Sequence, residues 1–150
     1  MTGINRIREN LNPFKQVSIA PLIIFRIIFG ALLFLGVARF MAKGWVSDMY
    51  ITPDFYFGYL GFEWVKPLPG NWMYLPFILM LLAALGIVLG VFYKWSASFF
   101  FLCFTYVELL DKTNYLNHYY FISLISFLLI LVPANRSLSL DVKLKRVKAI

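Results

Sequence analysis

Residues 17–41, VSIAPLIIFRIIFGALLFLGVARFM, decide the fold, because they form an apolar stretch in which Arg26 and Arg39 carry the only charges. A helix that crosses the roughly 30 Å hydrocarbon layer of a bilayer needs about 20 residues of this kind. Basic residues precede the stretch, as in a signal peptide, but it is too long for a signal core and ends without a small-x-small cleavage pattern. We therefore interpret it as a retained transmembrane helix.

Three further apolar stretches, residues 72–93, 95–110 and 119–132, predict three more membrane helices, the last of which ends before Pro133. The composition agrees, because 61% of the 150 residues are hydrophobic and 14% are charged, whereas about 25% are charged in an average soluble domain. The sequence therefore predicts an all-α membrane protein, a single four-transmembrane-helix bundle over residues 1–150. A disordered chain is excluded.

The segment between the first two predicted helices, residues 42–71, is amphipathic and rich in Gly and Pro. Its aromatic residues are interleaved with Asp and Glu: Trp45, Asp48, Tyr50, Asp54, Tyr56, Tyr59, Glu63 and Trp64. Aromatic side chains of this kind concentrate where membrane meets water. We expect the segment to be an interfacial loop lying on the bilayer surface.

Basic residues collect in two terminal tails, residues 1–16 and 134–150. Together with Lys94, the tails hold nine of the 14 Lys and Arg residues. The positive-inside rule then predicts that both termini are cytoplasmic, with the loop and residues 108–118 on the opposite side. The net charge of +7 therefore indicates orientation and contact with the lipid bilayer, and no nucleic acid partner is expected.

Residues 108–118, ELLDKTNYLNH, form the one dense polar cluster outside the tails. A histidine such as His118 can move protons near neutral pH, a desolvated lysine can act as a base, and a carboxylate can orient either group. The alternative is a hydrated loop in which Asp111 and Asn114 cap helix ends. One histidine and one cysteine make a zinc site improbable, and Cys103 is expected to be a small buried hydrophobe.

Arg26 lies within the first predicted helix, where a charge is costly and needs a partner or a purpose. It either pins helix packing or faces a ligand, and Glu108 is its natural opposite charge. The aromatic third helix, which includes Phe100 and Phe104, either forms a slot for a flat cofactor such as a quinone or packs as core and lipid contact. The spacing of Gly86 and Gly90 permits a close helix partner.

Leu109-Leu110-Asp111-Lys112-Thr113, followed by Asn117-His118 and Tyr120, resembles the signature of the vitamin K-dependent γ-glutamyl carboxylases and their bacterial relatives, the HTTM membrane domain. Supporting pieces occur in the family's order: residues 25–30, 68–69, 72–75, 84–86, 89–90, 133–135 and 139–141. The resemblance covers roughly residues 17 to 141. The Asp-Lys-Thr…Asn-His string is its specific part.

The resemblance implies an enzyme, a lyase by class, that oxidises a vitamin K hydroquinone or similar quinol to its epoxide. The strong base so produced removes a γ-proton from glutamate in a protein or peptide, and carbon dioxide then adds. The resemblance implies that His118 takes part in the carboxylation, with Lys112 and Asp111 in the same catalytic site. The implied quinol and substrate contacts are Thr113, Asn117, Tyr120, Arg26, Phe100 and Phe104.

The sequence departs from the family at one point. The lysine that deprotonates the hydroquinone in these enzymes belongs to a later membrane helix, Lys112 does not match it, and this chain stops at Ile150. We therefore expect the N-terminal part of such an enzyme or a shortened relative, without carboxylase or epoxidase activity in isolation. The alternatives are a non-catalytic four-helix membrane protein similar to DoxX-like proteins, and a quinone-binding subunit.

Overall fold

The described chain is built from helices that lie side by side. A computed structural model describes residues 18–148, and within this range it contains helices and no strands. The predicted basic tail 1–16, the predicted helix start at Val17 and the last two residues, 149–150, lie outside the described range. The all-α prediction is confirmed for the part of the chain that the structure describes.

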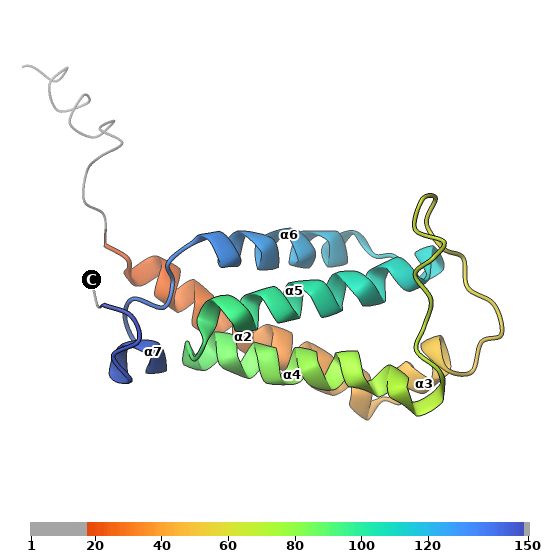
Figure 1. The fold of residues 1–150 in the computed structure, drawn as a ribbon, viewed down its shortest axis with the longest axis horizontal. Helices are drawn as coiled ribbons and strands as arrows, with labels where there is room; N and C mark the ends of the chain where they lie inside the picture. Colours follow the sequence, from red (N-terminus) through yellow and green to blue (C-terminus); the bar gives the residue numbers. More distant parts are fainter. Residues whose placement is uncertain (1–17, 149–150) are drawn as a thin grey trace, which may run out of the picture.

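Four long helices lie roughly parallel or antiparallel (Figure 1). They are α2 (Ala20–Ala42), α4 (Tyr74–Leu89), α5 (Tyr93–Leu110) and α6 (Asn117–Leu131). Shorter elements mark the two ends of the bundle. We call one the cavity end, which holds α3 (Trp45–Tyr50), η1 (Gly70–Met73) and η2 (Lys112–Asn114), and the other the α7 end, after α7 (Leu140–Lys143).

The predicted boundary between the second and third helices is wrong by a few residues. The second helix ends at Leu89 and not at residue 93, because Gly90 adopts a left-handed conformation with φ of 63°. A glycine in this conformation is the commonest way to end a helix. The third helix then begins at Tyr93 and not at residue 95.

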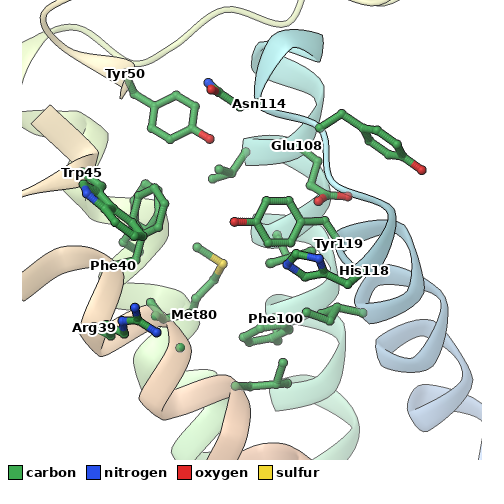
Figure 2. Close-up of a pocket in the computed structure, with 18 of the residues that line it drawn as sticks. Arg39, Phe40, Trp45, Tyr50, Met80, Phe100, Glu108, Asn114, His118 and Tyr119 are labelled. Atoms are coloured by element: carbon green, nitrogen blue, oxygen red, sulfur yellow. The ribbon is translucent and has the colours of Figure 1, made fainter. Parts of the chain in front are cut away.

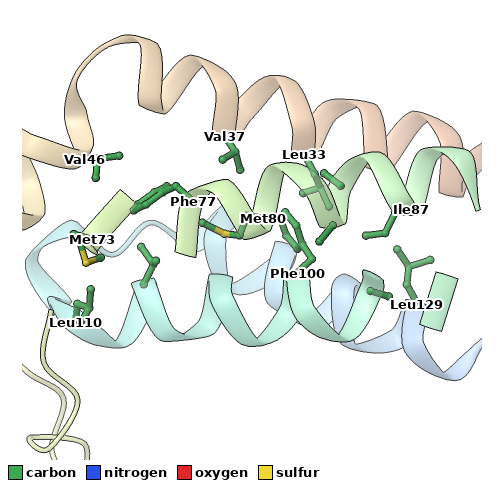
Figure 3. Packing of buried hydrophobic residues seen from close by; sticks show 14 of the residues in the cluster. Leu33, Val37, Val46, Met73, Phe77, Met80, Ile87, Phe100, Leu110 and Leu129 are labelled. Atoms are coloured by element: carbon green, nitrogen blue, oxygen red, sulfur yellow. The ribbon is translucent and has the colours of Figure 1, made fainter. Parts of the chain in front are cut away.

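The interior is apolar, and α4 lies at its centre. This helix packs against both α2 and α5, and α5 packs in turn against α6, whereas α2 and α6 have no comparable contact. Buried side chains from all four helices meet in one core (Figure 3): Leu33, Val37, Phe77, Met80, Ile87, Phe100 and Leu129 are among them. The separation of α2 from α6 leaves room for a cavity between them.

Large apolar side chains also cover the outside of the bundle. Leu32 of α2, Leu82 of α4, Leu102 of α5 and Leu131 of α6 are each between 61% and 63% exposed. Two segments, Ala20–Ala42 and Gly70–Leu89, are long and apolar enough to cross a membrane. This is the composition expected of helices that contact lipid rather than water.

Gly86 and Gly90 make contacts within the chain. A β-carbon at Gly86 would meet the side chain of Ser96, and one at Gly90 would meet Arg26 and Ser139. Both glycines therefore let parts of this chain approach closely. A partner helix on this face, expected from their spacing, stays a prediction.

Candidate functional site

A cavity of about 330 Å³ lies at the cavity end of the bundle (Figure 2). All four long helices line it, together with α3 and the segment that joins α5 to α6. The lining residues are Leu32, Leu33, Gly36, Val37, Arg39, Phe40, Trp45, Tyr50, Phe77, Met80, Phe100, Phe104, Val107, Glu108, Asp111, Asn114, Tyr115, His118, Tyr119 and Ile122. Its volume falls at the lower end of the roughly 300–1,000 Å³ typical of small-molecule sites.

Aromatic rings form much of the cavity wall. Phe40 and Phe77 are stacked with ring centroids 5.3 Å apart, and Phe100 and Phe104 are stacked at 5.7 Å. Tyr119 meets Phe104 edge to face at 5.9 Å. Rings arranged in this way suit a flat apolar ligand. The two phenylalanines predicted for such a slot, Phe100 and Phe104, do line the cavity.

The polar groups of the cavity include Glu108 and His118. The Ser123 hydroxyl donates to Glu108 Oε2 at 3.1 Å, while Glu108 Oε1 is buried with no hydrogen-bond partner among residues 18–148. The exposed imidazole of His118 lies edge to face with the Tyr119 ring, with the ring centroids 4.5 Å apart. Both rings border the cavity (Figure 2). A buried carboxylate oxygen without a partner can accept a proton or a hydrogen bond from a ligand.

Tyr50 adds a hydroxyl that points into the cavity from α3 (Figure 2). Burial raises the pKa of Tyr50, and the neighbouring Tyr119, Asp111 and Glu108 raise it further. The phenol is therefore neutral at physiological pH and available as a donor. Tyr50 is far in sequence from Glu108 and Asp111, and the fold brings the three residues to one cavity.

Asp111 has a second, structural role. Its Oδ1 accepts hydrogen bonds from the backbone N–H of Thr113 at 2.9 Å and from the Thr113 hydroxyl at 2.8 Å, which caps η2. The capping alternative is therefore confirmed for Asp111. The backbone N–H of Lys112 donates to Phe57 O at 2.9 Å and ties the loop to this segment.

Five predicted site residues lie outside the cavity lining: Arg26, at the other end of the bundle, and four residues close in sequence to the lining. Lys112, Thr113, Asn117 and Tyr120 are exposed, and they follow or flank residues that do line the cavity. Asn117 is the first residue of α6. These side chains are therefore close in sequence to the cavity lining but are not part of it.

Arg26 lies at the α7 end and is completely buried. Its Nη2 donates to Leu138 O at 2.7 Å, whereas Nε and Nη1 have no partner among the described residues and are enclosed where Gly90 and Ser139 pack against the guanidinium. The expected pairing with Glu108 is wrong, because Glu108 borders the cavity at the other end of the bundle. The neighbouring carboxylate is that of Asp141.

Asp141 organises the α7 end. Its carboxylate accepts hydrogen bonds from the backbone N–H groups of Phe92 (2.9 Å) and Tyr93 (3.1 Å) and from Asn135 Nδ2 (2.9 Å). Burial raises the pKa of Asp141, but these hydrogen bonds and the guanidinium of Arg146 outweigh burial and hold it below its usual value. Asp141 is therefore charged and caps the start of α5.

The sequence did not identify several cavity residues. Phe40, Trp45, Tyr50, Phe77 and Met80 lie on α2, α3 and α4, distant in sequence from the polar cluster. Each belongs to an apolar or interfacial stretch in which aromatic side chains are ordinary. The signal that could have found them is the relative rotation of the helices, which a single sequence does not contain.

The fold and the cavity define a class: a bundle of four long apolar helices with a cavity at one end. The sequence matches the HTTM domain over residues 14–149, and the chain belongs to that family. The family indicated by the Asp-Lys-Thr…Asn-His string is thus confirmed. No solved structure matches the chain.

Proposed function

We propose that the chain is a multi-pass membrane protein that crosses the bilayer four times, with both termini in the cytoplasm. The apolar outer faces of all four helices support this proposal, because such side chains would be exposed to water in a soluble bundle. At 1.5 Å per residue, α5 with 18 residues rises about 27 Å, close to the hydrocarbon thickness. The cavity then opens near the non-cytoplasmic surface.

Cysteine labelling tests this topology. In a chain with Cys103→Ala, a reagent that cannot cross membranes should label Leu60→Cys, which is 96% exposed in the loop, from outside intact cells. It should label Lys148→Cys only after the cells are opened. Labelling of Lys148→Cys from outside would overturn the orientation.

We further propose that the cavity binds a quinol. The observation that carries this proposal is the meeting of stacked aromatic walls with a buried carboxylate oxygen in one cavity of about 330 Å³. A quinol supplies two phenolic hydroxyls and, by the family resemblance, the reducing power for epoxide formation. Because α2 and α6 do not pack closely on each other, its hydrocarbon tail could reach lipid between these two helices.

The residues that line the cavity would then have different roles. Phe100 and Phe104 hold the ring, and Glu108 Oε1 accepts a hydrogen bond or a proton from one hydroxyl. His118 is exposed and borders the same cavity, so it can pass a proton on to water. Moving a proton from the ligand to water requires a group that contacts both.

By the same resemblance, we propose that the site belongs to γ-carboxylase-related chemistry on glutamyl residues. The exposed side chains around the cavity, Lys112, Thr113, Asn117 and Tyr120, are where a peptide could approach from water. Lys112 could attract the glutamate carboxylate, since an ammonium group is a strong point charge. Incorporation of labelled carbon dioxide into a glutamyl peptide, with reduced vitamin K, distinguishes carboxylation from quinol binding alone.

Quinol binding is tested first. The full chain in lipid nanodiscs is titrated with a reduced naphthoquinone, and Phe104→Leu is compared with Phe99→Leu. Both variants shorten an aromatic side chain on α5, but Phe99 is 51% exposed and does not line the cavity. We expect roughly tenfold weaker binding for Phe104→Leu, from the loss of one ring contact of about 1.4 kcal/mol, and no change for Phe99→Leu. Equal binding by all three proteins would reject the cavity as the quinol site.

A further inference from the structure

A second pocket, of about 370 Å³, lies at the α7 end. Three cationic side chains line it from three different segments: Lys94 at the start of α5, Arg136 after α6, and Arg146 after α7. The fold thus brings together charges that are far apart in the sequence. This pocket is separate from the cavity and shares no lining residue with it.

The carboxylate in this pocket is already engaged. Asp141 accepts hydrogen bonds from Phe92, Tyr93 and Asn135, and Arg146 Nη1 lies 3.9 Å from its Oδ1. The side chains of Lys94 and Arg136 are exposed and form no ion pair or hydrogen bond with residues 18–148. The pocket therefore carries a net positive charge available to an external anion.

Aromatic rings flank these cations. Trp95 is 67% exposed and Phe92 is 55% exposed, and the guanidinium of Arg146 lies 3.9 Å above the Phe92 ring. Exposed aromatic rings beside basic groups are typical of the level where lipid headgroups meet acyl chains. In the proposed topology this end faces the cytoplasm, whose leaflet contains anionic lipids. A soluble anion without an acyl chain would make no apolar contact with these exposed rings.

We propose that this pocket binds the phosphate of an anionic phospholipid of the cytoplasmic leaflet. Arg136 and Lys94 contact the phosphate, with the planar guanidinium suited to two of its oxygens. Trp95 and Phe92 lie against the first part of the acyl chains. The inference rests on insertion in the membrane and is independent of quinol binding in the cavity.

The test measures binding of phosphatidylglycerol and of phosphatidylcholine to the full chain in detergent, by native mass spectrometry. Lys94→Gln/Arg136→Gln is the pocket variant, and it leaves the Asp141 contacts intact. Lys143→Gln/Lys148→Gln is the matched control, because it removes the same charge near the same end from exposed residues that do not line the pocket. Thermal unfolding confirms that each variant is folded.

We expect the pocket variant to bind phosphatidylglycerol roughly 10- to 30-fold more weakly, from the loss of two cations near the headgroup. The control should change by less than twofold, and phosphatidylcholine should bind weakly to all three proteins. Equal losses in both variants would show a diffuse attraction to the tail and overturn the proposal. Displacement of the lipid by millimolar inorganic phosphate would identify a free-phosphate site, and this outcome also overturns it.

Discussion

Two carboxylates at opposite ends of the bundle, Asp141 and Glu108, differ in how their oxygens are paired. At the α7 end, Asp141 is 3% exposed and its carboxylate is filled by three hydrogen-bond donors from this chain. At the cavity end, Glu108 lines the cavity and keeps one buried oxygen without a hydrogen-bond partner among the described residues 18–148. A satisfied buried network stabilises a fold, whereas an unsatisfied group that faces a cavity is available to a ligand. Asp141 is therefore a structural residue, whereas Glu108 is the carboxylate that the proposed quinol site would use.

The largest expected effect comes from Asp141→Ala. It leaves the buried N–H groups at the start of α5 and the Asn135 amide without their acceptor. Each orphaned group costs about 1–3 kcal/mol, so we expect a loss of about 3–5 kcal/mol and a fall in Tm of roughly 10 °C. Thermal unfolding in detergent measures the change, and Asp54→Ala on the exposed loop is the control.

The pH dependence of this effect has a definite sign. Because the pKa of Asp141 is lower in the folded chain than its usual value of 3.8, its stabilisation is present above that value and is lost as the pH falls through the folded pKa. The difference in Tm between wild type and Asp141→Ala should be constant above about pH 5 and shrink below about pH 4. A difference that grew in acid would contradict the capping role.

Gly90→Ala should have the next largest effect. Gly90 has φ of 63°, and a β-carbon there would meet Arg26 Nη1 and Ser139. We expect a loss of about 2–3 kcal/mol, from left-handed strain of about 1–2 kcal/mol together with displacement of the guanidinium. Gly36→Ala is the matched control, because nothing lies within 4 Å of its added β-carbon. Similar stabilities of the two variants would remove Arg26 from the structural network.

The sequence predicted the helices well because their signal is local. Four apolar stretches, Pro133 after the last helix and Gly90 after the second carry the pattern of elements directly. The end of the second helix was placed four residues late, at residue 93 and not at Leu89, since the apolar stretch continues past Gly90 and hydropathy outweighed the glycine. Helix packing was not predictable, because every face of these helices is apolar and amphipathic periodicity is weak.

The site was predictable in part, because some of its residues belong to local sequence patterns. The polar string identified Asp111 and His118, and the aromatic helix identified Phe100 and Phe104, all of which line the cavity. Arg26 was grouped with them because the sequence shows that a charged residue lies within an apolar helix. The sequence does not show at which end of the bundle that residue lies. The structure places it at the α7 end, where Leu138 O, 112 residues away, accepts its hydrogen bond.

Glu108→Gln should change stability in the opposite direction to Asp141→Ala. A buried carboxylate with an unpartnered oxygen is costly, while an amide can still accept from Ser123 and costs less to bury. We expect stability to rise by about 1 kcal/mol and Tm by about 2–4 °C. Quinol binding should weaken roughly tenfold, from the loss of one charge-assisted hydrogen bond. Glu63→Gln, on the exposed loop, is the control. If Glu108→Gln instead lowered Tm as Asp141→Ala does, both carboxylates would be structural.

The smallest effect on stability is expected for His118→Gln. The imidazole is exposed and its ring contact is with its chain neighbour Tyr119, so its removal should change the free energy of unfolding by less than about 0.5 kcal/mol. Glutamine can form a hydrogen bond but does not take up a proton at neutral pH, so the variant should bind the quinol with wild-type affinity. Thermal unfolding and quinol titration measure these two properties. A fall in Tm of several degrees would show that His118 holds α6 in place and is, like Asp141, a structural residue.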